Sequence, residues 1–185
     1  MPVSTYMSSL LGKLLPPCHL LIFSTLLGTE LYQTFVMTKV SYNALPRSAF
    51  RTLQKRVFPI YFKTQATLLL LNAITFPSGG VWGLSTNKAD WIPHLVAGIT
   101  AILNLSIYEP RTRRSMILVA HQETRDSHVA SDGGQGREAE EATSRMQKAK
   151  RNFSRDHAMC IHLNLISIGA MVVYGIRLAS RLDVA

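Results

Sequence analysis

The stretch LPRSAFRTLQKRVFPIYFKTQATLLLLNAITF, residues 45–76, joins a basic segment directly to an apolar one. Residues 58–76 approach the length that a helix needs to cross the hydrocarbon of a bilayer, roughly 20 residues. Residues 45–58 place Arg47, Arg51 and Lys55 four positions apart on one helical face, with apolar side chains on another. The stretch therefore predicts a membrane span preceded by a basic helix that lies in the headgroup region.

Three further apolar runs flank this stretch, at residues 20–40, 91–108 and 159–179. Four such runs leave too little of the 185-residue chain to enclose them as a soluble core. The sequence predicts an all-α integral membrane four-helix bundle, a single tetraspan domain over residues 1–185, with spans at about 20–40, 58–76, 91–108 and 159–179. A short interfacial amphipathic helix is expected between spans 1 and 2, turning into span 2 at Pro59.

The first apolar run has two alternative interpretations, a cleaved signal peptide and a mitochondrial presequence. The run is longer than the usual apolar region of a signal peptide and lacks a convincing cleavage site, and no arginine precedes Arg47. We therefore expect the run to remain as the first span, in an endomembrane or the plasma membrane rather than a mitochondrial membrane.

The net charge of +9 is distributed unevenly along the chain. A nucleic-acid surface needs basic residues on a soluble face, whereas these residues lie between apolar runs, so no nucleic-acid partner is expected. Sixteen of the 20 Lys and Arg lie near or between spans 1 and 2 or spans 3 and 4. The positive-inside rule then predicts that both basic loops are cytoplasmic and both termini are lumenal or outer.

The basic face between the first two spans suggests a partner in the bilayer. Arg51, Lys55 and Arg56 are expected to face anionic lipid headgroups. The alternative is a solvated positive loop with no specific lipid. Protein partners cannot be read from these residues.

Polar side chains inside the spans recur at spacings of three and four residues, as expected for stripes that face a bundle interior. The polar members of this seam are Glu30, Gln33, Gln65, Asn104 and Asn164. Hydrogen bonds between helices are one role for the four amides. An intramembrane carboxylate such as Glu30 is either neutralised by its partners or functional, and both alternatives stay open.

Motifs for catalysis or cofactor binding are not legible in the sequence. His19 and His94 near the outer boundary, with Cys18, would suit a haem or a metal, but no CxxCH, HExxH or paired-cysteine spacing supports such a site. No nucleophile triad, phosphate loop or pair of catalytic carboxylates stands out. We expect neither a cofactor nor an enzymatic activity.

Residues 111–156 are the longest polar segment and are expected to form a partly flexible cytoplasmic loop. A helix is predicted to continue through Gln122, and SDGGQG at 131–136 predicts a break. The charged residues after this break predict a helix that leads into span 4.

Four quoted motifs resemble the transmembrane protein 205-like family, which shares a tetraspan domain of otherwise unknown function. They are HLLIFSTLLGTELYQTFV (19–36), LPRSAFRTLQKRVFPIYF (45–62), YEPRTRRSM (108–116) and RNFSRDHAMCIHLNL (151–165). The outer turn and residues 138–150 depart from the family pattern. The resemblance implies solute or xenobiotic handling, or vesicle trafficking. The alternative is a non-transporting scaffold or assembly factor that binds lipid or protein partners through its basic loops.

Several motif positions gather at the predicted cytoplasmic boundary, namely Arg47, Glu109, Arg111, Arg155 and His157. They suggest a charged network in which Glu109 pairs with one or more of the three arginines. The alternative is that each residue contacts lipid separately.

Overall fold

The computed structural model describes residues 3–77, 79–131 and 137–181. These residues form helices joined by short connections, and they contain no strand. In chain order the elements are α1 (Val3–Leu31), the π-helical segment η1 (Tyr32–Met37), α2 (Thr38–Ala44), α3 (Arg47–Ile74), α4 (Gly80–Ser85), α5 (Lys88–Leu103), the π-helical segment η2 (Asn104–Tyr108), α6 (Glu109–Ser131) and α7 (Arg137–Ala179).

Four long helical segments in the described part of the chain are apolar enough to cross a membrane, which confirms the predicted all-α fold with four spans. They are Gly12–Ala44, Arg47–Ile74, Lys88–Arg125 and Thr143–Ala179. The third contains 38 residues. At a rise of about 1.5 Å per residue it is about 57 Å long, nearly twice the hydrocarbon thickness of about 30 Å. The polar segment after span 3 is therefore largely helical, and residues 132–136 of the predicted break lie outside the described residues.

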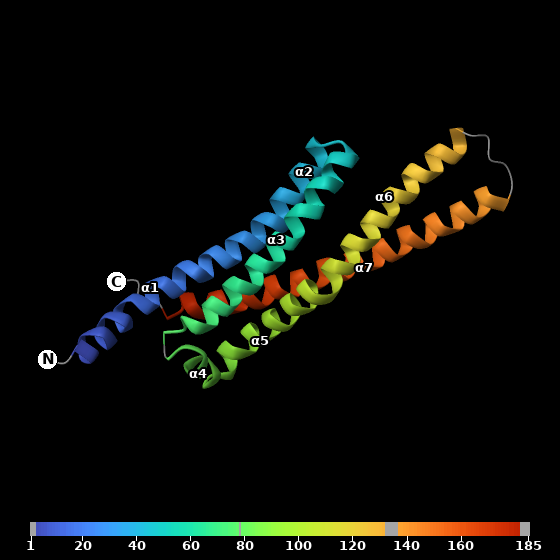
Figure 1. The fold of residues 1–185 in the computed structure, drawn as a ribbon. Helices are drawn as coiled ribbons and strands as arrows, with labels where there is room; N and C mark the ends of the chain where they lie inside the picture. The colour runs from blue at the N-terminus through green and yellow to red at the C-terminus, as the bar shows by residue number, and fades with distance from the viewer. Residues whose placement is uncertain (1–2, 78, 132–136, 182–185) are drawn as a thin grey trace.

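The four spans form two antiparallel hairpins (Figure 1). α1, η1 and α2 pair with α3, and α5, η2 and α6 pack along α7. The first turn of α5 and the short α4 lie at the same end as the end of α7, whereas the α2–α3 turn lies toward the opposite end. The two hairpins lie side by side near α4 and diverge toward α2 and α6.

The basic segment before span 2 differs from its prediction. Residues 47–58 are not a separate interfacial helix, because α3 runs unbroken from Arg47 to Ile74 with Pro59 inside it. Proline lacks an N–H, so the helix loses the bond to the carbonyl four residues earlier, a loss that packed membrane helices tolerate. The chain turns instead at Pro46, whose ψ of 148° is incompatible with a helix.

The predicted seam faces the bundle interior. Every polar seam residue is buried, and so are its apolar neighbours Leu26, Ala97, Ala101 and Met171. These apolar side chains belong to a hydrophobic core that lies in the half of the bundle nearer α4. Large apolar side chains on the outside, including Ile176 at 66% exposure, suit contact with lipid.

Gly175 in α7 packs against the aromatic ring of Phe23. A Cβ atom at this position would lie 2.6 Å from Phe23 Cζ, so Gly175→Ala is expected to lower the free energy of unfolding by about 1–3 kcal/mol. Unfolding in mixed detergent micelles, followed by circular dichroism, measures the change. Gly169→Ala on the same helix is the matched control, since its Cβ would meet no heavy atom within 4 Å. Equal effects of the two substitutions would contradict the close contact.

Candidate functional site

Glu30 lies at the centre of a buried polar cluster that joins three helices. Its Oε1 accepts hydrogen bonds from Gln65 Nε2 at 2.6 Å and from Ser167 Oγ at 2.9 Å. The side chain is inaccessible to solvent. Among the described residues, Oε2 has no hydrogen-bond partner. The cluster therefore ties α1 to α3 and α7 through neutral donors.

Asn164 extends this cluster toward the divergent end of the bundle. Its Oδ1 accepts from Tyr61 Oη at 2.7 Å and from Gln65 Nε2 at 3.4 Å, and its Nδ2 donates to Thr34 Oγ1 at 2.8 Å. The structure thus brings Glu30, Gln65 and Asn164 together, as the predicted seam requires.

The other two predicted amides, Gln33 and Asn104, are buried but do not join this cluster. Asn104 Nδ2 donates to the backbone carbonyl of Cys160 at 3.2 Å, and Gln33 Nε2 has no partner among the described residues. Gln33 lies in η1 and Asn104 begins η2. A π-helix bonds each N–H five residues back rather than four, so it changes the phase in which following side chains emerge.

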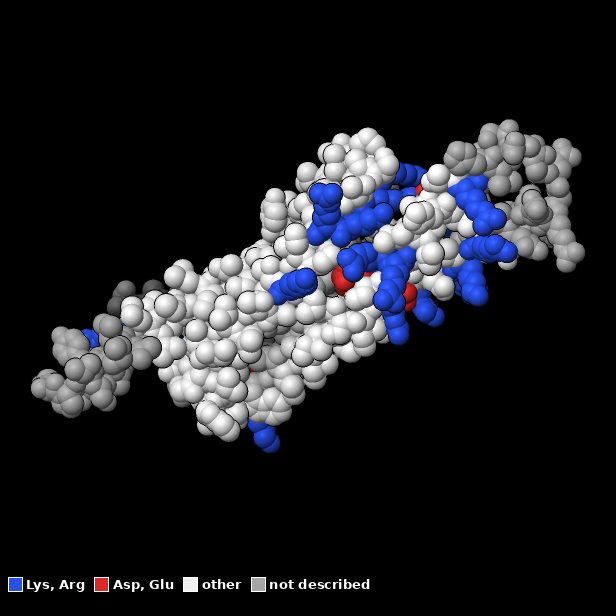
Figure 2. Space-filling view, viewed as in Figure 1, with Lys and Arg blue, Asp and Glu red and all other residues white. Residues whose placement is uncertain are grey.

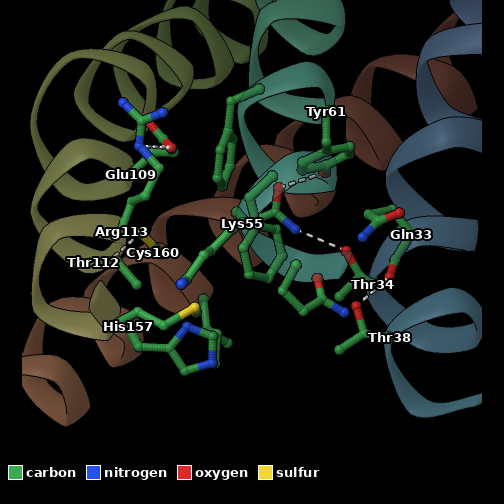
Figure 3. Close-up of a pocket in the computed structure, with 16 residues that line it drawn as sticks. Gln33, Thr34, Thr38, Lys55, Tyr61, Glu109, Thr112, Arg113, His157 and Cys160 are labelled. Atoms are coloured by element: carbon green, nitrogen blue, oxygen red, sulfur yellow. Dashed lines mark hydrogen bonds and ion pairs between the residues drawn. The ribbon is translucent and has the colours of Figure 1, made fainter. Parts of the chain in front are cut away.

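A pocket of about 170 Å³ lies beside Asn164, between the two hairpins. It is lined by all four spans, and Figure 3 shows its polar side chains converging from opposite walls. The lining residues are Gln33, Thr34, Thr38, Gln54, Lys55, Phe58, Tyr61, Phe62, Glu109, Thr112, Arg113, Met116, His157, Cys160, Ile161 and Asn164. The pocket reaches the Asn164 end of the polar cluster, while Glu30 does not line it.

Gln54 is the most unusual residue of the pocket wall. Its side chain is 1% exposed, and neither Nε2 nor Oε1 has a hydrogen-bond partner among the described residues. Buried amides are nearly always hydrogen-bonded, so an unpaired one beside a cavity calls for an explanation. The predicted seam did not include Gln54, although it stands 11 residues, about three helical turns, before the seam residue Gln65.

The predicted charged network does not form. Glu109 Oε1 lies 3.5 Å from Arg113 Nε, and in the described residues Glu109 is not paired with Arg47, Arg111 or Arg155. Residues four apart share a helical face, whereas residues two apart do not, which explains why Arg113 replaces Arg111.

The other two members of that network have separate surroundings. Arg155 lies 3.5 Å from Asp156. His157 lines the pocket and stacks on Phe153 with ring centroids 5.4 Å apart.

Two of the three residues assigned to lipid headgroups instead face protein. Arg51 donates to Glu123 through two nitrogens, with Nη2 3.1 Å from Oε1, and this ion pair links α3 to α6. Lys55 lines the pocket, and only Arg56 is exposed. The reason is that the continuous α3 turns the face carrying residues 51 and 55 toward α6. Figure 2 shows Lys and Arg gathered at this end, over α3, α6 and α7.

A second polar network fills the opposite half of the bundle around Tyr174. His19 Nε2 hydrogen-bonds Tyr174 Oη at 2.5 Å and its Nδ1 hydrogen-bonds Thr75 Oγ1 at 3.2 Å. His94 Nε2 hydrogen-bonds Asn72 Oδ1 at 2.7 Å, and its ring packs 4.3 Å from that of Tyr174. His94 Nδ1 bonds the backbone carbonyl four residues earlier, so both histidines already use both ring nitrogens. A haem or metal there would have to displace these bonds.

Next to this network, Asp90 at the start of α5 holds the end of α7. Its carboxylate accepts from Arg177 Nε at 3.0 Å and from Arg181 Nη2 at 2.6 and 2.8 Å. Our sequence interpretation missed this clamp, although both elements were predicted at the outer boundary. The sequence did carry a signal for it, because Asp90 and the two arginines have opposite charges and lie at the same predicted depth on two spans.

The fold and its buried polar clusters define a multi-pass membrane protein whose four spans enclose a small pocket. Comparison with known proteins agrees with this class, and the chain belongs to the family of the domain of unknown function DUF4149, whose pattern matches residues 21–120. It is similar to the Xanthocillin biosynthesis cluster protein D of Aspergillus fumigatus, with 39% identity over 166 residues that cover 90% of each chain. No solved structure matches the chain.

Proposed function

We propose that this protein binds small amphipathic solutes in its pocket and handles them at the membrane, in the manner implied by the resemblance to the transmembrane protein 205-like family. The unpaired Gln54 amide in the pocket wall is the observation that carries the proposal. Ligand pockets combine an apolar lining with a few placed polar groups, and this pocket has both. The proposal includes no catalytic step.

The charge distribution supports an orientation for this activity. Lys and Arg gather at the divergent end of the bundle (Figure 2), which is cytoplasmic by the positive-inside rule. In this proposal the pocket is loaded from the cytoplasmic side, and both termini are lumenal or outer. The host membrane is an endomembrane or the plasma membrane, and exposed cations such as Arg56 contact anionic lipid.

The fungal relative is named for a biosynthesis cluster. Biosynthesis of a compound requires that intermediates and products be held, moved or stored, so the name is compatible with solute handling here. The name supports no particular solute for this chain.

A scaffold that moves no solute is the second candidate. The complete burial of Glu30 favours it, because this carboxylate does not line the pocket described above. In that case the basic end would bind lipid or protein partners, and the polar cluster would only hold the helices together.

Release of a solute from reconstituted proteoliposomes distinguishes a solute-handling protein from a scaffold. Proteoliposomes containing the full chain are loaded with a fluorescent amphipathic solute, and we expect faster release than from protein-free liposomes. Gln54→Leu, which removes the pocket-wall amide, is expected to slow release several-fold while leaving thermal unfolding nearly unchanged, since neither polar atom of the Gln54 side chain has a hydrogen-bond partner among the described residues. Thr67→Leu, at an exposed position on α3, serves as the control.

Two results would count against solute handling by this route. Release equal to that of protein-free liposomes favours the scaffold, and affinity capture from the native membrane would then identify what it holds. Normal release by Gln54→Leu would show that the Gln54 amide does not contact the solute, and the observation that carries the proposal would be lost.

A further inference from the structure

The charges around the pocket are not balanced. Glu109 is within 3.5 Å of Arg113, so these two lining charges offset each other. Lys55 lines the same pocket, and no carboxylate in the described part of the chain pairs with it. Figure 3 shows the Lys55 side chain extending into the middle of the pocket, between the walls formed by α3 and α7. The lining lysine, arginine and carboxylate together therefore carry one positive charge.

Hydrogen-bond donors that have no partner in the described residues also lie in the pocket wall. Gln54 is adjacent to Lys55 in α3, and its Nε2 is buried without a partner in the described residues. Gln33 Nε2, on the facing wall, is also unpaired there. Two amide N–H₂ groups and an ammonium group are the donors that an anionic oxygen cluster accepts from.

The rest of the wall combines polar side chains with an apolar group, Phe58, Phe62, Met116 and Ile161. The volume of about 170 Å³ is below the range of about 300–1,000 Å³ for pockets that enclose drug-sized ligands. The pocket can therefore enclose the head and the first part of a ligand. The rest must leave the pocket, and an apolar chain is compatible with a surrounding bilayer.

We propose that the pocket takes an amphiphile with a single anionic head, a carboxylate or a phosphate, which pairs with Lys55 and accepts from Gln54. The apolar chain next to the head packs on Phe58 and Met116. This inference rests on the proposed function and specifies its substrate class. A cationic amphiphile is disfavoured, because Glu109, the one carboxylate among the described lining residues, lies 3.5 Å from the positive charge of Arg113.

Binding to the full-length protein in phosphatidylcholine nanodiscs tests the head group. The probes are radiolabelled decanoate, decanol and decyltrimethylammonium, measured by scintillation proximity. We expect decanoate to bind about tenfold or more tightly than the other two, the difference that one charge-assisted hydrogen bond supplies. Lys55→Gln should abolish this preference, whereas Arg56→Gln, which removes the exposed neighbouring cation, should preserve it.

Protection of Cys160 shows where the probe binds. Cys160 lines the pocket, and Cys18→Ser removes the exposed cysteine that would otherwise react. Decanoate is expected to slow maleimide labelling of Cys160 in this background, and not when Lys55→Gln is added. Adding phosphatidate to the nanodiscs distinguishes the source of the head group. If phosphatidate competes with decanoate, the anionic head belongs to a phospholipid. If phosphatidate does not compete, the head belongs to a free amphiphile. Either result supports the inference.

The possible failures are distinguishable. If all three probes bind equally and protect Cys160, and Lys55→Gln changes none of them, the anionic head is overturned while solute binding stands. If no probe binds or protects Cys160, both the inference and the proposed function are overturned.

Discussion

Replacing Gln65 with leucine is expected to lower the free energy of unfolding by about 2–3 kcal/mol. Gln65 Nε2 donates to Glu30 Oε1 at 2.6 Å and lies 3.2 Å from Ser167 Oγ, inside a region that water does not reach. Leucine has nearly the same volume but no donor, so the substitution removes hydrogen bonds rather than packing. Glu30 would keep Ser167 as its donor. Unfolding in mixed detergent micelles measures the change.

A second substitution identifies the cause of this loss. Where both partners of a buried hydrogen bond become apolar, most of the stability returns, because no polar group is left unpaired. Because Ser167 also donates to Glu30, the triple variant Glu30→Leu, Gln65→Leu, Ser167→Ala, which removes all three partners, is expected to be more stable than Gln65→Leu alone. Thr67→Leu, two residues further along α3 and exposed, should change little. A triple variant that is less stable than Gln65→Leu would show that the cluster acts through packing instead.

The seam was predictable because polar side chains within a membrane span are costly in lipid and therefore face the bundle interior. Glu30, Gln65 and Asn164 lie on the expected faces, and the structure brings them into one cluster. The same stripe, extended back by 11 residues from Gln65, reaches Gln54, which is equally buried. We missed it because the basic row through Arg51 and Lys55 suggested a separate surface helix.

One feature was beyond a periodic interpretation of the sequence. The π-helical segments η1 and η2 interrupt the α-helical phase at Gln33 and Asn104, and a stripe drawn at α-helical spacing does not predict a wider turn. The partner of Glu109, by contrast, followed from the helix expected through Gln122, in which Arg113, four positions on, shares the face of Glu109. The predicted network was wrong because it considered only Arg47, Arg111 and Arg155.

The clamp at Asp90 gives the second large effect. Asp90→Ala is expected to lower the free energy of unfolding by about 2 kcal/mol or more, because the carboxylate is the acceptor for both Arg177 and Arg181. The side chain of Asp90 is 2% exposed, whereas those of Arg177 and Arg181 are 34% and 42% exposed. The arginines can regain water after the substitution, so the cost stays below that of a fully buried unpaired charge.

The reciprocal substitutions test which side of the clamp matters. Each single substitution, Arg177→Gln or Arg181→Gln, should lower the free energy of unfolding by less than Asp90→Ala does, since the other arginine still binds the carboxylate. The double variant Arg177→Gln, Arg181→Gln should lower the free energy of unfolding by at least as much as Asp90→Ala, because it leaves a buried carboxylate without its cations. Lys88→Ala, an exposed cation in the first turn of α5, is the matched control and should be nearly neutral. If the two single arginine losses simply added to the double loss, each arginine would contribute independently and Asp90 would not act as a shared anchor.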